Sequence, residues 1–296
     1  MKVGIIGGSG LYAMEGLDVV TSEHVETPFG HPSDCYVCGK LGCHDVYFLP
    51  RHGVGHRLMP SEINHRANIY GFKKLGVELV LSVSAVGSLR EDFRPRDVVL
   101  PDQYYDRTKQ SRVHTFFGDG MVAHVGFGEP ACPGLRAQLA RAGETVLARR
   151  GQGEAGPRLH VGGTYVCMEG PAFSTRSESQ IYRKLGCDLI GMTSLPEAKL
   201  CREAELCYQS ISMITDYDCW HPDTSAVTVD MVTAHMQANA VLAQDILREA
   251  VTSELHLDAA CTCRGALAVS LATDPGRVPE DTREKLSLLL GRYWNV

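Results

Sequence analysis

Residues 3–11 read VGIIGGSGL, an apolar strand pattern that runs into a glycine-rich turn. The dinucleotide-binding fingerprint is G-x-G-x-x-G between a strand and a helix, with an acidic residue about 20 positions later. Here the glycines are spaced G-x-x-G-G-x-G, and Gly16 follows before a helix can form. The stretch therefore argues against a dinucleotide site. A buried strand that ends in free backbone N–H groups and the Ser9 hydroxyl suits a phosphate instead.

Strand patterns and helical patterns alternate along most of the chain. We predict strands at 2–6, 35–37, 46–50, 79–84, 97–101, 163–168, 188–192 and 206–215. We predict helices at 61–75, 134–147, 177–185, 196–204, 229–253 and 279–290. Interleaving of this kind indicates an α/β fold, a twisted mixed β-sheet flanked by helices. Nothing like a linker or a repeat divides the sequence, so we expect a single domain over 1–296. The stretch 104–133 has no clear period, and a loop this long is usually functional or part of an interface.

The composition narrows the class of protein. With 44% hydrophobic and 22% charged residues, the 296-residue chain is typical of soluble globular proteins. A net charge of −6 disfavours a nucleic-acid-binding surface, which is normally basic. The longest nearly apolar run, 79–86, is too short to span a bilayer. Because a strand begins at Lys2 with no basic leader before it, we expect a cytoplasmic enzyme without membrane or nucleic-acid partners.

Eleven cysteines raise the question of a metal or a disulfide. The motif CYVC at 35–38 has the spacing of half a zinc knuckle, but the second C-x-x-C is missing. Strand alternation would also point its two thiols to opposite faces. The motif CTC at 261–263 could form a strained disulfide or bridge back to Cys201 or Cys207. Cytosolic disulfides are uncommon, so we expect free buried thiols and no metal site.

Other predicted strands also end in residues suited to an anion. RHG at 51–53 directly follows one predicted strand. SVSAVGS at 82–88 and GMT at 191–193 contain the ends of two others. Open α/β sheets bind ligands at the carboxyl ends of their strands. Together with Ser9, these stretches supply hydroxyls, backbone N–H groups and one guanidinium, which is what a phosphate dianion needs.

The strongest chemical signal is the stretch ITDYDCW at 214–220. Asp216 and Asp218 stand at i and i+2 at a strand end, so they point to the same side. A retaining glycosidase also uses two carboxylates, but it has no use for an anion site beside them. No His or Glu stands beside them at the spacing of a metal site.

At this point the chain resembles the 5′-methylthioadenosine phosphorylases of the trimeric purine nucleoside phosphorylase family, from Lys2 to about Glu254. The tail at 255–296 matches weakly. The resemblance rests on these stretches: GIIGGSGL at 4–11, TPFGHPSD at 27–34, RHGVGH at 51–56, MPSEINHRANI at 59–69, GSLRED at 87–92, DQYYDRT at 102–108, EGPAFSTRSES at 169–179, GMTSLPEAKLCREAELCY at 191–208 and TDYDCW at 215–220.

The resemblance implies phosphorolysis of S-methyl-5′-thioadenosine by inorganic phosphate, which yields adenine and 5-methylthioribose 1-phosphate. It also implies a homotrimer with active sites at subunit interfaces, and no cofactor, since phosphate is a co-substrate. Carried over position by position, it assigns phosphate binding to Ser9, Arg51, His52, Ser84, Ala85 and Thr193. It assigns nucleoside binding to Phe173 beside the base, Met192 at the ribose, Asp216, Asp218, Val229 and Val232 at the 5′ group, and His124 from a neighbouring subunit.

The chemistry of the reaction divides the roles of the two aspartates. Cleavage of the glycosidic bond pushes electrons into the purine, and an acid at N7 relieves that charge. We expect Asp218 to be this acid, with a pKa raised by its enclosed site. Asp216 would accept a hydrogen bond from the 6-amino group, whereas a 6-oxopurine would leave the carboxylate without a donor.

Three other functions remain open at this stage. One is a phosphorylase of 6-oxopurine nucleosides or 5′-methylthioinosine on the same fold. Another is a nucleoside-binding protein without turnover, which would need neither an attacking phosphate nor an acid. The third is a nicotinamide-dependent dehydrogenase.

Overall fold

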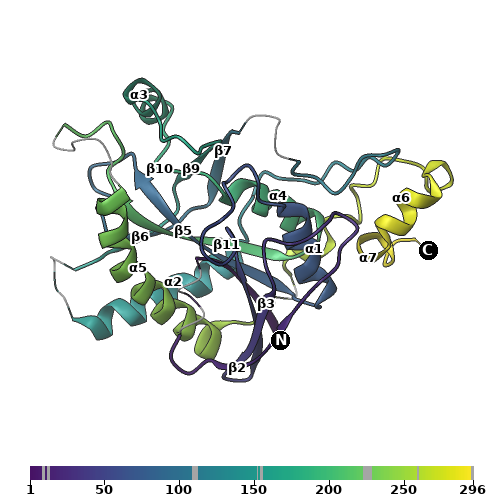
Figure 1. The fold of residues 1–296 in the computed structure, drawn as a ribbon, viewed down its shortest axis with the longest axis horizontal. Helices are drawn as coiled ribbons and strands as arrows, with labels where there is room; N and C mark the ends of the chain where they lie inside the picture. The colour runs from purple at the N-terminus through teal and green to yellow at the C-terminus, as the bar shows by residue number, and fades with distance from the viewer. Residues whose placement is uncertain are drawn as a thin grey trace.

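Eleven strands form one mixed sheet with helices on both faces in the computed structural model (Figure 1). It describes residues 1–8, 11, 14–108, 113–151, 153, 156–222, 229–258 and 260–294, without the side chains of 229–234 and 254. The strands are β1 Lys2–Gly7, β2 Asp18–Glu23, β3 Tyr36–Leu41, β4 His44–Pro50, β5 Leu79–Ser88, β6 Val98–Leu100, β7 Gln103–Arg107, β8 Leu159–Val161, β9 Thr164–Met168, β10 Leu189–Gly191 and β11 Cys207–Asp216. The helices are α1 His65–Lys74, α2 Pro133–Arg150, α3 Arg176–Lys184, α4 Ser194–Glu203, α5 Val229–Glu249, α6 Glu280–Lys285 and α7 Ser287–Leu290.

Strand β5 is the centre of the sheet because it pairs with three other strands. Its first half lies parallel to β1, its whole length lies parallel to β11, and its last two residues pair antiparallel with β10. The main path runs β2-β3-β4-β1-β5-β10-β9-β7, while β11, β6 and β8 continue from β5 in a second direction. Because β4, β1, β5 and β11 run parallel to one another, their carboxyl ends lie along one edge.

The period-two alternation of β1 explains how both faces of the sheet are covered. Val3 and Ile5 belong to a hydrophobic core shared with α2 and α5, whereas Ile6 belongs to a core shared with α1 and α4. Gly4 lies on the α1 side, where a Cβ would come within 2.9 Å of the Phe72 ring. In Figure 1, α2 and α5 lie together on one side of the strands and α1 and α4 on the other. The sheet is therefore buried on both faces, as parallel sheets require.

The C-terminal segment crosses from one face of the molecule to the other. After α5 the chain returns toward the α1 and α4 side, where α6 and α7 lie at the far right of Figure 1. Leu286, Leu289 and Leu290 join the same core as α1 and α4. Leu271 pairs with Ala123 in an isolated bridge, so the tail also contacts the stretch 104–133.

The predicted fold class is confirmed, and every predicted strand and helix is present with shifted ends. Three strands were missed. All six residues of β2 are exposed and most of β7 is too, so neither has the alternation of a half-buried strand, and β8 is only three residues long. The prediction of a loop at 104–133 is wrong at its start, where β7 lies. The predicted helix 279–290 is two short helices that meet at Leu286.

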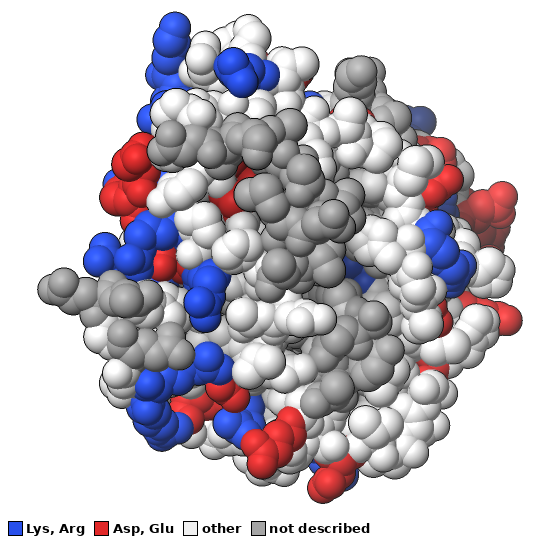
Figure 2. Space-filling view, turned by 60° about the vertical axis from the view of Figure 1, so that its left-hand side comes forward, with Lys and Arg blue, Asp and Glu red and all other residues white. Residues whose placement is uncertain are grey.

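The described surface carries both signs of charge. On the face drawn in Figure 2, lysine and arginine side chains are interspersed with aspartates and glutamates. Within the described part of the chain, no helix is long and apolar enough to cross a membrane.

Candidate active site

The sheet brings the predicted strand ends together at one edge. The Arg51 backbone N–H donates to the Gly7 carbonyl at 2.9 Å, which joins the ends of β4 and β1. Asp216 at the end of β11 pairs with Gly87 near the end of β5. Antiparallel pairing of β10 with the last residues of β5 directs the chain after Gly191 back along β5. Five strand ends that are far apart in the sequence thus line one site.

Arg51 is buried and forms an ion pair with Glu197 of α4. Its Nε donates to Glu197 Oε1 at 2.5 Å, and its Nη2 donates to Glu197 Oε2 at 3.3 Å and to Ser82 Oγ at 2.7 Å. Nη1 donates to the Val83 carbonyl at 2.9 Å. Burial opposes the charge, but the Glu197 carboxylate outweighs it and raises the pKa of Arg51. Since Nε and Nη2 are both engaged, only Nη1 has an N–H to spare for a ligand.

A second group of donors lies where β5 and α4 meet. The Ser84 hydroxyl is buried, and its Oγ has no hydrogen-bond partner among the described residues. Thr193 is the N-cap of α4, yet its side chain makes no capping hydrogen bond. The helix N-terminus presents unpaired backbone N–H groups and partial positive charge, which attract anions. These hydroxyls and N–H groups, close to the Arg51–Glu197 pair, are the kinds of donor that can bind an anion.

The two aspartates lie next to each other beside Gly87. A Cβ added at Gly87 would lie 3.2 Å from Asp216 Oδ1 and 3.4 Å from Asp218 Cβ, so both aspartates face this glycine. The Asp218 backbone N–H donates to Asp216 Oδ1 at 3.0 Å, and the Thr215 hydroxyl donates to Asp216 Oδ2 at 2.6 Å. The prediction that both carboxyl groups share one side of the strand end agrees with this geometry.

Both aspartates are buried, and their surroundings differ. Burial raises the pKa of Asp216 to about 6, an increase that the Thr215 hydrogen bond opposes and the nearby Asp218 charge reinforces. Asp218 is 4% exposed, and its two oxygens accept from the Ser174 hydroxyl at 3.1 and 2.9 Å.

Trp220 fixes the loop that carries Asp218. Its indole N–H donates to the Ser88 carbonyl at 2.7 Å, and the Arg183 guanidinium lies over its ring at 3.5 Å from the centroid. On the other side of β11, the Asn239 amide of α5 donates to the Ile214 carbonyl at 2.9 Å. The strand end is therefore held from both directions, which limits the positions that the carboxyl groups can take.

The remaining predicted residues are positioned less tightly. His52 is half-buried, its Nδ1 lies 2.8 Å from the Leu58 carbonyl oxygen, and its ring stacks on His56. Ala85 is exposed on β5, and Met192 is half-buried directly before Thr193. Phe173 is 54% exposed, so its face is free to meet a ligand or another subunit.

Three predicted contacts lie outside what the structure describes. Ser9 is not among the described residues, and the side chains of Val229 and Val232 are not described although their backbone belongs to α5. His124 is exposed, and its backbone N–H donates to the Ser270 carbonyl of the tail at 2.8 Å. The single chain does not test whether His124 reaches a neighbouring site.

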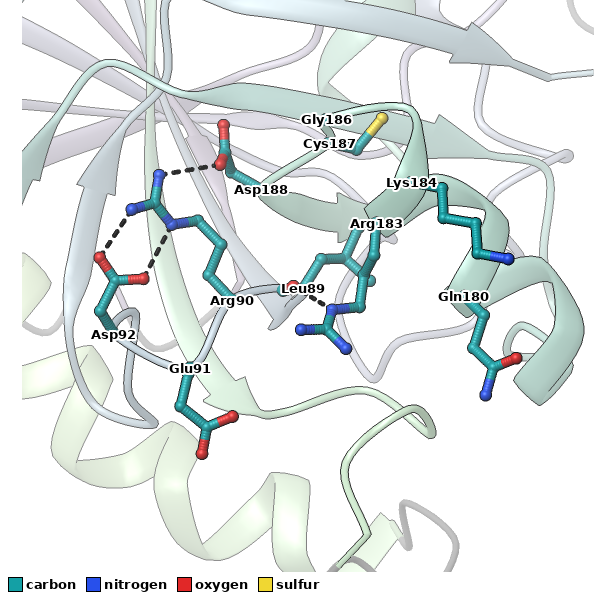
Figure 3. Close-up of a pocket in the computed structure, with 10 residues that line it drawn as sticks. All are labelled: Leu89, Arg90, Glu91, Asp92, Gln180, Arg183, Lys184, Gly186, Cys187 and Asp188. Carbon is teal, nitrogen blue, oxygen red and sulfur yellow. Dashed lines mark hydrogen bonds and ion pairs between the residues drawn. The ribbon is translucent and has the colours of Figure 1, made fainter.

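A cavity of about 620 Å³ lies apart from these residues, between the loop after β5 and helix α3 (Figure 3). It is lined by Leu89, Arg90, Glu91, Asp92, Gln180, Arg183, Lys184, Gly186, Cys187 and Asp188. The Arg90 guanidinium is bound to Asp92 and Asp188, and Arg183 donates to the Leu89 carbonyl, as Figure 3 shows. We place the active site at the aspartates because this cavity contains none of the predicted site residues, and its Arg90 guanidinium is already paired with Asp92 and Asp188.

Sequence reasoning missed three residues that organise the site. Glu197 neutralises Arg51, Ser174 holds Asp218, and Thr215 holds Asp216. Ser174 and Thr215 lie inside the matched stretches at 169–179 and 215–220, so their hydroxyls could have been noted. Glu197 also lies inside a matched stretch, at 191–208, but it gave a weaker signal because it is one of several charged residues in the predicted helix 196–204.

Comparisons with known proteins found relatives that match almost the whole chain. The model of the phosphorylase superfamily matches residues 2–252. The chain is 55% identical over 293 residues to an S-methyl-5′-thioadenosine phosphorylase of Koribacter versatilis, covering 99% of this chain and 97% of that protein. It also superposes on a methylthioadenosine phosphorylase from an Antarctic soil metagenomic library, with a TM-score of 0.89, 46% identity, and 97% and 98% of the two chains covered. The enzyme of Schistosoma mansoni in complex with adenine is similar at a TM-score of 0.81, 36% identity and 98% of both chains.

Proposed function

The chain belongs to the methylthioadenosine phosphorylases of the phosphorylase superfamily, and on that basis we propose that it cleaves S-methyl-5′-thioadenosine with inorganic phosphate. The products are adenine and 5-methylthioribose 1-phosphate. The observation that carries this proposal is the adjacency of two buried carboxyl groups and an anion site at one sheet edge. A phosphorolysis needs both, because phosphate attacks the sugar while the purine leaves.

The reaction assigns each group a task. A phosphate oxygen attacks the anomeric carbon as the bond from that carbon to N9 breaks, and the bonding electrons pass into the purine. Asp218 donates a proton to N7, with the Ser174 hydroxyl positioning its carboxyl group. Proton donation of this kind contributes about 10²–10⁴ in rate. Asp216 accepts the hydrogen bond of the 6-amino group, which selects adenine over 6-oxopurines.

Phosphate is held by groups that make few contacts within the chain. We assign it to the Ser84 hydroxyl, Thr193 with the N-terminus of α4, and the remaining Nη1 N–H of Arg51. His52, Ala85 and Ser9 complete the phosphate set by resemblance. A dianion gains most from such preorganised donors, since hydrogen bonds to charged groups are about twice as strong as neutral ones.

Met192 and Phe173 contact the ribose and the base in this proposal. Val229 and Val232 form an apolar wall for the 5′-methylthio group. A 5′-hydroxyl placed against them would lose its hydrogen bonds to water without gaining others from the protein. That loss costs roughly 1–3 kcal/mol, so methylthioadenosine is the better substrate by about tenfold or more. His124 of a neighbouring subunit completes the pocket in a homotrimer.

We also assign the enzyme to the cytoplasm and to purine and methionine salvage. All eleven cysteines are free in the structure, which suits a reducing compartment. The reaction returns the purine base and the sugar as separate products for reuse.

One set of assays tests the proposal. Release of the free purine base is measured with methylthioadenosine, adenosine and inosine, each with and without phosphate; the base is adenine for the first two and hypoxanthine for inosine. We expect phosphate-dependent release, fastest with methylthioadenosine and slowest with inosine. Release without phosphate would indicate a hydrolase, equal rates for methylthioadenosine and adenosine would contradict the apolar 5′ pocket, and binding without turnover would indicate a nucleoside-binding protein.

A further inference from the structure

Four cysteines from distant parts of the sequence meet on the α2 side of the sheet. Cys132 precedes α2, Cys207 begins β11, and Cys261 and Cys263 come from the tail. Their sulfur atoms all lie within 4.8 Å of one another, and three of the four residues are buried. The active-site aspartates are at the opposite end of β11, so this cluster has no part in the chemistry described above.

The spacing of the sulfurs matches one particular coordination geometry. The Cys207 and Cys261 sulfurs are 3.4 Å apart, and the Cys132 and Cys261 sulfurs are 3.6 Å apart. A tetrahedral zinc site has Zn–S bonds of about 2.3 Å, which places its sulfurs about 3.8 Å from one another. A disulfide would bring two of them to about 2.05 Å. Two of the sulfur–sulfur distances are thus close to those of a ZnS₄ tetrahedron and too long for a disulfide, and all four sulfurs lie within 4.8 Å of one another.

We propose that these four cysteines bind one zinc ion as a closed structural site. Soft thiolate ligands in a tetrahedral set select zinc among the common divalent ions. Four protein ligands leave no open position for water or substrate, so the ion has a structural role and not a catalytic one. On binding, the four thiols release their protons to solvent and coordinate as thiolates.

The surroundings of the cluster can balance the negative charge of such a site. Cys132 is the N-cap of α2, an 18-residue helix, so the partial positive charge of that helix end points toward its sulfur. The Arg202 guanidinium lies close enough to Cys263 to act on it electrostatically. The Cys132 backbone N–H donates to the Tyr208 carbonyl at 2.8 Å, which fixes Cys132 beside Cys207.

Zinc at this position would anchor the tail. The match to the superfamily model ends at residue 252, before Cys261 and Cys263. These two cysteines are the tail's ligands, while Cys132 and Cys207 belong to the body of the sheet. Beyond them the tail pairs Leu271 with Ala123, next to His124. The ion would therefore hold in place the segment that supports the loop assigned to the subunit interface.

The experiment measures metal and thiols in the full-length protein. Protein purified from zinc-supplemented cells under reducing conditions is analysed by plasma mass spectrometry, and free thiols are counted by alkylation of the denatured chain without reductant. We expect one zinc per chain with all eleven thiols free. Removal of zinc should lower the Tm, and Co²⁺ added to the stripped protein should give the absorption bands of a tetrahedral tetrathiolate.

Variants and the contrary outcomes complete the test. Cys263→Ser should lose most of the zinc, whereas Cys187→Ser, which removes a buried cysteine in another core, should keep it. If Cys263→Ser does not fold, the Co²⁺ spectrum of the wild-type protein still decides. Disulfides among the four cysteines, or eleven free thiols with no zinc taken up and no tetrathiolate spectrum, would overturn the proposal.

Discussion

Asp216 and Asp218 show how the environment of single residues divides two identical side chains. Asp216 is buried against a second carboxyl, which raises its pKa to about 6, while Asp218 accepts from the Ser174 hydroxyl. When the Asp216 carboxyl group is ionised, both of its oxygens can accept a hydrogen bond from the purine 6-amino group; when it is protonated, one of them carries a donor O–H. The activity of the enzyme should therefore depend on the ionisation of Asp216.

We expect kcat/KM for methylthioadenosine to fall as the pH drops through about 6, because protonation removes the charge of Asp216 and turns one of its oxygens into a donor that opposes the 6-amino group. Well below that value the loss is about tenfold per pH unit, since kcat/KM follows the ionisation of the free enzyme. In Asp216→Asn this limb should disappear. The variant should also lose activity on adenine nucleosides and gain activity on 6-oxopurine nucleosides. A variant that keeps the wild-type pH profile and preference would show that Asp216 does not contact the base.

Ser84 gives the clearest test of the phosphate site. Its hydroxyl has no partner among the residues that the structure describes, so Ser84→Ala should leave the Tm unchanged. Loss of a hydrogen bond to a charged ligand costs roughly 1.5–3 kcal/mol, which should raise the phosphate KM by about tenfold or more. Ser179→Ala removes the buried hydroxyl of a serine in α3 and serves as the control. An unchanged phosphate KM in Ser84→Ala would place the anion elsewhere.

At the scale of elements, the Arg51–Glu197 pair joins the end of β4 to α4. The two residues are 146 positions apart, and Glu197 is completely buried. The Glu197 carboxylate also accepts from Ser82 of β5 and Tyr208 of β11. One ion pair thus fixes three strands and the helix whose N-terminus we assign to phosphate binding.

Removal of one partner should destabilise the protein strongly. Arg51→Ala leaves a buried carboxylate without its cation, at a cost of about 3–5 kcal/mol. Arg57→Ala, which removes an exposed pair with Asp34, should cost less than about 1 kcal/mol. Unfolding in denaturant measures both. The double variant Arg51→Met with Glu197→Leu should recover much of the stability but bind phosphate poorly. A loss in Arg51→Ala no larger than in Arg57→Ala would contradict this account.

At the scale of the whole molecule, the exposed side chains of Phe173 and His124 are available to another subunit. The backbone of His124 is held by the tail. A shared active site makes a strict prediction about mixed oligomers. Some trimers will contain both Asp218→Asn and His124→Ala subunits. In these, a site can combine the intact Asp218 of a His124→Ala subunit with the intact His124 of an Asp218→Asn subunit.

Co-expression of the two variants should therefore restore methylthioadenosine turnover above the level of either variant alone. Light scattering should give three times the chain mass. If mixed oligomers show only the average of the two variant activities, His124 does not complete a neighbouring site.

The sequence predicted the fold and the positions of the site better than the contacts within it. Apolar runs at 79–84 and 206–215 marked β5 and β11 because both strands are buried on both faces. Strand β2 could not be seen because its side chains are exposed. The partner of Glu197 is 146 positions away, and no local spacing reveals it. The motif at 261–263 and its link to Cys207 could be seen in the sequence, but the approach of Cys132 to them could not.

The burial of the Arg51–Glu197 pair also restricts how the protein can change over generations. A single replacement at either position leaves an unneutralised charge inside the sheet, so intermediates with one change are unstable. The two positions can be exchanged together for apolar residues, but that route gives up a phosphate donor. The two residues are therefore inherited as one unit. A library screened for stability alone would yield double replacements at these positions. A library screened for growth that depends on the enzyme would yield only the original arginine and glutamate.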